Sequence, residues 1–348
     1  MTTETQKSTT QQPIEWEYSA APERFPISID RTNKLFIGGK FVSPKSRKWF
    51  ASSNPATNEK LADIASAGTA DVNAAVLAAK KALPKWSKLA GSERAKYLYR
   101  IARRIQERAR EFAVLETIDG GKPIKEARDI DIPLVARHFY YHAGWTRNPT
   151  LNNQKSIGVI GQIIPWNFPL LMLSWKIAPA IAAGNTVVLK PSEMTPLSTL
   201  KAAEYFAEIF PPGVINIIVG RGNTVGAALA SHPKVRLISL TGDISTGKKV
   251  LQAASDNLKK THLELGGKAP VIVFDDADLK EVIENVRTFG YYNAGQDCTA
   301  PCRIYASSKI YENLVADLSS AVSNIKSGGQ DEKGVEMGPL ISERQQER

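Results

Sequence analysis

The sequence predicts an α/β fold, in which a Rossmann-like parallel-sheet cofactor domain is followed by a second α/β catalytic domain that is incomplete. The first observation is a set of short apolar runs, at residues 157–164, 186–190, 214–219 and 237–240, which alternate with helical patterns. The second is a new strand–helix series that begins after Gly267. The third is the length of 348 residues, enough for two domains and a large core.

Residues 1–29 form a segment rich in Thr, Gln and Glu, which predicts a mostly disordered tail. The tail lacks the apolar core of a secretory signal, and its acidic residues argue against a transit peptide. The first ordered element expected is a hairpin over residues 35–42 that turns on Gly38 and Gly39.

Three helices are expected before the sheet. The first is Ala-rich, is capped by Thr69 or Asp71, and is stopped by Pro84. The second runs without a break over residues 92–117, and the third covers about 124–144.

The remaining elements alternate between strand and helix. Helices are expected up to residue 183 and over 197–209, 279–292 and 310–325, and strands over 270–274 and 302–306. Ligands bind at the carboxyl ends of parallel strands, which directs attention to the loops after Ile164, Leu189, Val219 and Leu240.

Composition argues against several classes of protein. The net charge is +10, from 45 Lys and Arg against 35 Asp and Glu. The basic residues are scattered without interleaved aromatics, which favours a solvated surface over nucleic-acid binding and leaves a field that attracts anionic ligands. Two cysteines argue against a disulfide framework or a zinc site and favour a cytoplasmic location. No apolar run reaches the length of a membrane span.

The loops after the first two strands carry polar side chains suited to catalysis and ribose binding. In residues 165–169, the Asn167 amide is placed to donate to an oxyanion, an interaction worth about 3 kcal/mol in a transition state. The alternative is a turn asparagine between prolines. In the next loop, Lys190 and Glu193 are suited to ribose hydroxyls, and the glutamate would repel a 2′-phosphate and so favour NAD over NADP. The alternative is an exposed loop pair.

The next two loops are rich in glycine. Residues 220–226 form a G-x-G-x-x-x-G pattern after a strand, which resembles a dinucleotide-binding loop with one extra residue. Residues 241–247 open a helix whose N–H groups would suit phosphate, although Asp243 caps that helix and would repel pyrophosphate. The alternative for both loops is a turn that uses glycine for its geometry alone.

A carboxylate and a thiol complete the candidate chemistry. Glu264 stands at an expected strand end, where partial burial would make it a useful base, and the alternative is a surface glutamate. Cys298 is a candidate nucleophile, with a buried structural thiol as the alternative. Cys302 is expected to be a buried structural thiol because it opens an apolar strand. The histidines show no spacing typical of ligation or a triad and receive no role: His138, His142, His232 and His262.

Taken together, these segments resemble the NAD(P)-dependent aldehyde dehydrogenase superfamily over residues 35–348. The matching pieces are Pro165-Trp166-Asn167-Phe168-Pro169, Lys190-Pro191-Ser192-Glu193, Leu240-Thr241-Gly242, Glu264-Leu265-Gly266-Gly267-Lys268 and Gly295-Gln296-Asp297-Cys298. Residues 288–303 look most like aminobutyraldehyde (aminoaldehyde) dehydrogenases, whereas residues 130–145 look closer to another branch.

The resemblance implies a mechanism. The Cys298 thiolate attacks the aldehyde to form a thiohemiacetal, and the Asn167 amide with the Cys298 N–H holds the oxyanion. Hydride transfer to nicotinamide leaves a thioester, which water activated by Glu264 hydrolyses to the acid. The resemblance also places the cofactor NAD against Ile164, Pro165, Trp166, Lys190, Ser192, Glu193, Gly222, Gly226, Gly242, Thr246 and Leu265.

The resemblance further implies a domain plan, with an NAD-binding domain at 30–265, a reduced oligomerisation segment near 145–156, and a truncated catalytic domain at 266–348. Asp243 stands where many members carry Ser, and the chain ends before the family's Glu-x-Phe-Gly-Pro motif. The expected partner is a small-molecule aldehyde such as 4-aminobutanal, with no nucleic acid or membrane. Homo-oligomerisation is a property of the family, and both the truncation and the reduced segment near 145–156 argue against it for this chain. The alternative function is that of an inactive fragment that binds NAD or another subunit.

Overall fold

The computed structural model describes residues 27–148, 154–330 and 332–347. The expected tail therefore lies almost entirely outside the described residues, as does the middle of the segment near 145–156.

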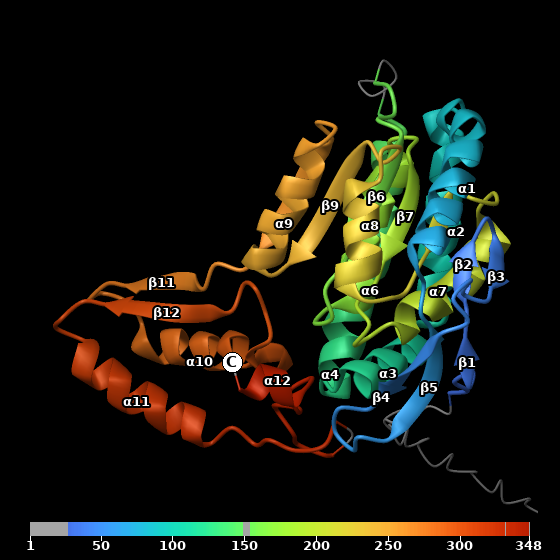
Figure 1. Ribbon diagram of the computed structural model, residues 1–348. Coiled ribbons are helices and arrows are strands. Elements are labelled where there is room, and N and C mark those ends of the chain that lie inside the picture. The colour runs from blue at the N-terminus through green and yellow to red at the C-terminus, as the bar shows by residue number, and fades with distance from the viewer. Residues whose placement is uncertain (1–26, 149–153, 331, 348) are drawn as a thin grey trace, which may run out of the picture.

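A seven-stranded sheet forms the centre of the molecule (Figure 1). Its order is β10 (Lys260–Leu265), β9 (Leu237–Gly242), β6 (Val159–Ile163), β7 (Thr186–Lys190), β8 (Ile215–Ile217), β2 (Leu35–Ile37) and β3 (Lys40–Val42). Strands β10 to β8 are parallel, and the β2–β3 hairpin adds antiparallel strands. The hairpin turns on Gly38 and Gly39, at φ of 62° and 81°, the left-handed conformation that such a turn requires. The expected α/β fold is confirmed.

Helices cover both faces of the sheet. The crossovers through α6 (Pro169–Ala182) and α7 (Leu197–Ile209) lead from β6 to β8, and those through α8 (Ala227–Ser231) and α9 (Ile244–Ser255) lead back to β10. Right-handed crossovers in opposite directions place the two pairs on opposite faces. The helix α1 (Thr69–Ser87) packs with α8, whereas α2 (Gly91–Glu107), α3 (Ala109–Gly120) and α5 (Ile132–Trp145) pack over α6 and α7.

Two smaller sheets complete the described chain. One contains β1 (Thr32–Asn33), β5 (Lys60–Ala65) and β4 (Trp49–Ser53), which the sequence patterns did not predict. The other contains β11 (Ala269–Val273) and β12 (Pro301–Ala306). The helix α10 (Leu279–Gly290) connects these two strands, and α11 (Tyr311–Ser323) and α12 (Glu343–Gln346) follow them. This unit, orange to red in Figure 1, extends away from the central sheet.

The first helix does not stop at Pro84, contrary to the expectation. It continues to Ser87 because the buried Trp86 packs in the core and donates its indole N–H to the Ile181 carbonyl at 3.1 Å, and this packing outweighs the hydrogen bond that proline removes. The N-cap is Gly68, whose N–H donates to the Asp71 carboxylate at 2.9 Å, so Asp71 contributes from inside the first turn.

The helix expected over residues 92–117 is two helices. It breaks between α2 and α3 at Arg108, where φ is −111° and ψ is 17°. The next helix is also interrupted, because a π-turn (Ala127–Asp131) separates α4 (Ile124–Glu126) from α5. Such stretches redirect side chains. Glu126, just before this one, and Asp131, at its end, both contact the segment that leads to Cys298.

Candidate active site

The carboxyl ends of the parallel strands meet at one edge of the sheet, as expected from their alternation with helices. At this edge the Ile164 N–H donates to the Lys190 carbonyl at 3.1 Å, which joins the loops after β6 and β7. The ends of β9 and β10 are aligned in the same way, with Leu265 opposite Gly242. The loops after β6, β7, β9 and β10 therefore lie along the same edge of the sheet, where one ligand can contact several of them.

The end of β7 carries a buried ammonium group. Lys190 Nζ donates to the Pro191 carbonyl at 2.7 Å and to Glu193 Oε2 at 3.1 Å. Its side chain is 3% exposed and that of Glu193 is 37% exposed. Burial lowers the pKa of Lys190, and the Glu193 charge opposes that shift. Ser192, in the same loop, accepts a hydrogen bond from the Met194 N–H at 3.2 Å.

The donor set at this edge fits the ribose and phosphates of a dinucleotide. The Lys190 ammonium donates and the Glu193 carboxylate accepts, which matches ribose hydroxyls. A side chain at Gly222 would meet no heavy atom within 4 Å, so the loop leaves open space above the strand ends. Gly226 lies beside this pair, since a Cβ there would sit 3.8 Å from Lys190 Cδ.

The N-terminus of α9 forms the next wall. Asp243 is the N-cap and accepts a hydrogen bond from the Ser245 N–H at 2.8 Å, as the sequence indicated. Thr246 is exposed in the first turn. Gly247 lets the helix approach β10, because a Cβ there would lie 2.8 Å from Leu265 Cδ1. The Asp243 carboxylate occupies part of this helix N-terminus and would compete with a phosphate.

The loop that carries Cys298 is tied to the loop that carries Asn167. The Asn167 side-chain amide donates to the Gln296 carbonyl at 2.8 Å, and the Asn293 side chain donates to the Asn167 carbonyl at 2.8 Å. Asn293 and Ala294 have φ of 51° and 57°, a conformation that non-glycine residues rarely adopt and that often marks functional sites. One N–H of the Asn167 amide is therefore engaged in holding the loop, which leaves its second N–H for an oxyanion.

The cysteines are not buried structural thiols. Cys298 is an exposed residue, although its partly enclosed sulfur has a pKa raised by burial, by the Asp297 charge and, to a smaller extent, by Glu264. Cys302 is also exposed, so the expectation of burial was wrong. It lies on β12, which pairs with a single strand, β11, within the described residues and so leaves its side chains with little cover.

Glu264 stands near the end of β10, as expected, but its side chain is 54% exposed rather than partly buried. The reason is that β10 is the edge strand of the central sheet. The Glu264 carboxylate pairs with His262, whose Nε2 lies 3.6 Å from Glu264 Oε1.

A buried charged cluster beneath Asn167 was missed by the sequence reasoning. Lys122 Nζ lies 2.5 Å from Asp131 Oδ2 and donates to the Asn167 carbonyl at 3.1 Å. The Tyr292 hydroxyl donates to Asp131 Oδ1 at 2.8 Å, and the Asn293 N–H donates to Glu126 Oε2 at 3.0 Å. Sequence offers no local signal for these contacts, because their members lie up to 167 positions apart.

The remaining cofactor-loop positions fit the same edge. Pro165 and Trp166 are half-buried in the loop after β6, and the Trp166 carbonyl accepts a hydrogen bond from the Thr195 hydroxyl at 3.0 Å. This bond connects the Asn167 loop to the loop that follows Glu193.

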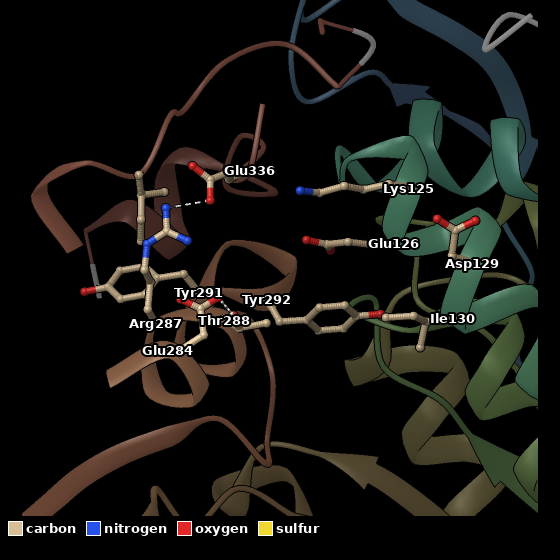
Figure 2. Close-up of a pocket in the computed structure, with 11 residues that line it drawn as sticks. Lys125, Glu126, Asp129, Ile130, Glu284, Arg287, Thr288, Tyr291, Tyr292 and Glu336 are labelled. Carbon is tan, nitrogen blue, oxygen red and sulfur yellow. Dashed lines mark hydrogen bonds and ion pairs between the residues drawn. The ribbon is translucent and has the colours of Figure 1, made fainter. Parts of the chain in front are cut away.

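A pocket of about 330 Å³ lies between the π-turn region and α10 (Figure 2). Arg287 spans one wall and pairs with Glu336 at 2.6 Å. The pocket is lined by Lys125, Glu126, Asp129, Ile130, Glu284, Arg287, Thr288, Tyr291, Tyr292, Ile325 and Glu336. Its walls carry more carboxylates than cations and include two tyrosines.

The comparison with protein families decides the assignment. The model of the "Aldehyde dehydrogenase family" matches residues 41–348. The chain belongs to the aldehyde dehydrogenase family. The resemblance stated from the sequence motifs is thereby confirmed at the level of the superfamily.

Relatives agree in sequence and in fold. "Aldehyde dehydrogenase family 2 member B4, mitochondrial" of Arabidopsis thaliana is 42% identical over 95% of this chain and 65% of its own length. The NAD+ complex of an aldehyde dehydrogenase from Bacillus cereus is 42% identical, with a TM-score of 0.88 over 92% of this chain and 68% of that one. Betaine aldehyde dehydrogenase from Staphylococcus aureus, solved with NAD+, is 36% identical, with a TM-score of 0.86 over 90% of this chain and 65% of that one. This chain thus spans about two thirds of the length of these aldehyde dehydrogenases.

Within the described ranges, no helix combines the length and the apolar character that crossing a membrane requires.

Proposed function

We propose that this aldehyde dehydrogenase oxidises an aldehyde to the carboxylic acid with NAD, using Cys298 as nucleophile and Glu264 as base. The observation that supports the proposal most directly is the Asn167–Gln296 hydrogen bond of 2.8 Å, which ties the cysteine loop to the carboxyl edge of the sheet. That bond brings a thiol, an amide donor and the dinucleotide-fitting loops to one place. Glu264 is close enough for its charge to act on the Cys298 sulfur.

In the proposed reaction the Cys298 thiolate attacks the aldehyde carbon and forms a thiohemiacetal. The free N–H of Asn167 and the backbone N–H of Cys298 donate to the developing oxyanion. After the carbon is oxidised, the product is a thioester on Cys298. Glu264 takes a proton from water, the resulting hydroxide attacks the thioester, and the C–S bond breaks to release the acid and the thiolate.

The cofactor supplies a hydride acceptor when it is bound. We propose that Lys190 and Glu193 hold its adenine ribose, and that Glu193 disfavours a 2′-phosphate through like-charge repulsion. Gly222 and Gly226 leave room for the dinucleotide backbone, while Gly242, Thr246 and Leu265 line its path at the ends of β9 and β10. Ile164, Pro165 and Trp166 complete the wall, and Ser192 orders the loop that carries Glu193.

The proposed substrate is an ω-aminoaldehyde such as 4-aminobutanal. The pocket in Figure 2 supports this assignment because carboxylates and tyrosine rings attract an ammonium group, and it adjoins the segment that leads to Cys298. Glu284 and Tyr291 line the pocket on the α10 side, and Glu126 lines the opposite wall.

The activity is tested with the full chain, NAD and 4-aminobutanal, by following NADH formation at 340 nm. Turnover that Cys298→Ala abolishes is expected. Cys302→Ala is the matched control and should retain turnover, because that exposed thiol lies on β12, outside the Gln296 turn that Asn167 holds. NAD binding without turnover by any short aldehyde would contradict the proposal and favour the alternative of an inactive NAD-binding chain.

The substrate class is tested separately by comparing kcat/KM for 4-aminobutanal and butanal. We expect Glu284→Gln to lower the ratio of the two values about fivefold, the effect of weakening one charge contact. Glu312→Gln, on the exposed face of α11, should leave the ratio unchanged. Equal values for the two aldehydes in the parent protein would contradict the ω-aminoaldehyde assignment and leave the aldehyde dehydrogenase activity standing.

We also propose a cytoplasmic location, which the free state of Cys298 and Cys302 supports. Cell fractionation with an antibody against the protein tests it, and recovery in an organelle fraction would contradict it.

A further inference from the structure

A polar row crosses the central sheet on the face covered by α6. Gln162 of β6, Ser239 of β9 and His262 of β10 stand directly opposite one another in register. Above them Lys176, on α6, is 6% exposed and donates to Ser239 Oγ at 2.8 Å. A cavity of about 360 Å³ opens against Lys176, Ser239 and His262. The regular geometry of the strand also places His262 and Glu264 on the same face of β10, because side chains alternate along a strand.

The hydrogen bonds of this row fix the tautomer of His262. Burial lowers the pKa of Lys176 to about 8, with the Glu264 charge opposing the shift, so the ammonium form prevails at pH 7 and donates to Ser239. The serine hydroxyl then has its own hydrogen to donate, and its neighbour at 2.9 Å is His262 Nδ1. Burial and the Lys176 charge lower the pKa of His262, so the ring is neutral at pH 7. The proton of the neutral ring is therefore on Nε2, which faces Glu264.

We propose that His262 is a positioning residue, which holds the Glu264 carboxylate through its Nε2–H while the Lys176–Ser239 contact fixes its tautomer. The separation of 3.6 Å between Nε2 and Oε1 is slightly longer than a hydrogen bond, so the two groups stand in close polar contact. The inference rests on the proposed role of Glu264 as the base. It adds a residue whose contact with the base follows from the alternation of side chains along β10.

The physical reason is the exposure of Glu264. A carboxylate that is 54% exposed on an edge strand samples several rotamers, of which only some point at an attacking water. The ionisable groups that face His262 are Lys176 from α6 and Glu264 on its own strand. The Lys176 charge favours the neutral ring with its proton on Nε2, and that N–H faces the Glu264 carboxylate. Both contacts favour one orientation of the base.

The test isolates the step that needs the base. With 4-nitrophenyl acetate and no NAD, the Cys298 thiolate attacks the ester carbonyl and the C–O bond breaks, which releases nitrophenolate and leaves an acetyl thioester. Water then attacks that thioester, its proton passes to Glu264, and the C–S bond breaks to give acetate and the thiolate. The nitrophenolate burst reports acylation, and the loss of the acetyl group from Cys298, followed by mass spectrometry, reports deacylation.

The full chain is compared with His262→Leu, His262→Gln, Ser239→Ala and Glu264→Gln, and thermal melting checks that each variant is folded. His262→Leu is expected to keep the burst and to deacylate about tenfold more slowly at pH 7, because Glu264 loses the contact that orients it. His262→Gln, which retains an N–H at a similar reach, should restore most of the deacylation rate. Ser239→Ala should slow deacylation by less than His262→Leu does. The matched control is His232→Leu, which should match the parent protein. His232 is the C-cap of α8, in the turn that precedes β9, and its carbonyl accepts a hydrogen bond from Lys259 just before β10 begins.

The outcomes separate the two proposals. Absence of acetylation at Cys298, or a parent protein that deacylates no faster than Glu264→Gln, overturns the proposed function and this inference with it. A normal burst and a Glu264-dependent deacylation whose rate His262→Leu leaves unchanged overturn the inference alone. A slower rate in His262→Leu with no recovery in His262→Gln also overturns it, because that pattern is a loss of packing.

Discussion

Cys298 is a residue whose surroundings oppose ionisation of its thiol. Partial burial is the largest cause of its raised pKa, followed by the neighbouring Asp297 carboxylate. A nucleophilic thiol needs its thiolate form, so a cationic group or a donor must reach the sulfur during catalysis. The backbone N–H of Cys298 already donates to this sulfur and opposes the rise in pKa.

At the residue scale, the alkylation of Cys298 by iodoacetamide should rise with pH through a midpoint above that of an ordinary thiol. Asp297→Asn should move this midpoint downward, because it removes a negative charge beside the sulfur. Peptide mass spectrometry must assign the modified site, since Cys302 is also exposed. A midpoint below the ordinary thiol value would show that the environment stabilises the thiolate instead.

The charge of Glu193 is expected to set the preference between NAD and NADP. Glu193→Gln should weaken NAD binding about tenfold and improve NADP binding, because the amide loses a charge-assisted hydrogen bond to ribose and no longer repels a 2′-phosphate. Fluorescence titration of the full chain with each dinucleotide measures both affinities. Glu204→Gln, which alters the Lys201–Glu204 surface pair on α7, is the control. If Glu193→Gln keeps the same preference between NAD and NADP, the adenine ribose does not bind at Glu193.

At the scale of elements, α3 supplies buried carboxylates to the N-termini of two other helices. Glu116 accepts the Leu170 N–H at 2.9 Å at the start of α6, and Asp119 accepts the Leu197 N–H at 2.9 Å at the start of α7. Ser52 donates to Asp119 at 2.7 Å. These contacts satisfy N–H groups that helix starts leave unpaired, and they set the direction in which α6 leaves the Asn167 loop.

The protonation of Asp119 makes stability depend on pH. Burial raises its pKa to about 7 in the folded chain, whereas an unfolded aspartate ionises near 3.9. Its contribution to the free energy of unfolding is therefore complete below about pH 4 and is lost as pH rises to about 7, by at most about 4 kcal/mol. Asp119→Asn should flatten urea-unfolding stability over this window, while exposed Asp63→Asn should not. An unchanged pH slope in Asp119→Asn would contradict the assignment.

At the scale of the whole molecule, polar contacts, an aromatic stack and the packing of Gly338 and Pro339 against Gly121 join the unit that carries β11 and β12 to the rest of the described chain. Tyr292 stacks on Phe168 at 6.0 Å and donates to Asp131, and Gln330 donates to Asn54 at 3.2 Å. We propose a boundary after Leu265, where the central sheet ends and the chain enters the second unit. The proposed thiol lies at this junction, so the fit between the units sets the geometry of the site.

Tyr292→Phe should loosen the junction and leave the central sheet intact. The variant keeps the ring stack but leaves Asp131 without its hydroxyl partner, a loss of about 1–2 kcal/mol. Hydrogen exchange is expected to quicken over residues 290–298 and in α4, with no change in β6 and β7. Tyr305→Phe, on an exposed tyrosine of β12, is the control. Faster exchange throughout the central sheet would show instead that the contact stabilises the whole fold.

The sequence predicted the strands of the central sheet and the loops at their carboxyl ends because these depend on local apolar runs and on the parallel topology that they imply. Asn167, Lys190, Glu193 and Glu264 all fall at strand ends where they were expected. The same patterns could not show that Pro84 lies inside a helix, since the decisive contact is that of Trp86 with Ile181, nearly a hundred positions away. They also missed the edge position of β10, which leaves Glu264 exposed.

By itself the sequence determined the order of elements and the chemical groups at the end of each strand, because residue type and spacing act over a few positions. Tertiary structure alone decided which of those groups meet. The Lys122–Asp131–Tyr292 cluster and the row from Lys176 to Glu264 exist because burial and strand register bring side chains together from distant segments. Their energies depend on desolvation and on distance, and a short stretch of sequence determines neither quantity.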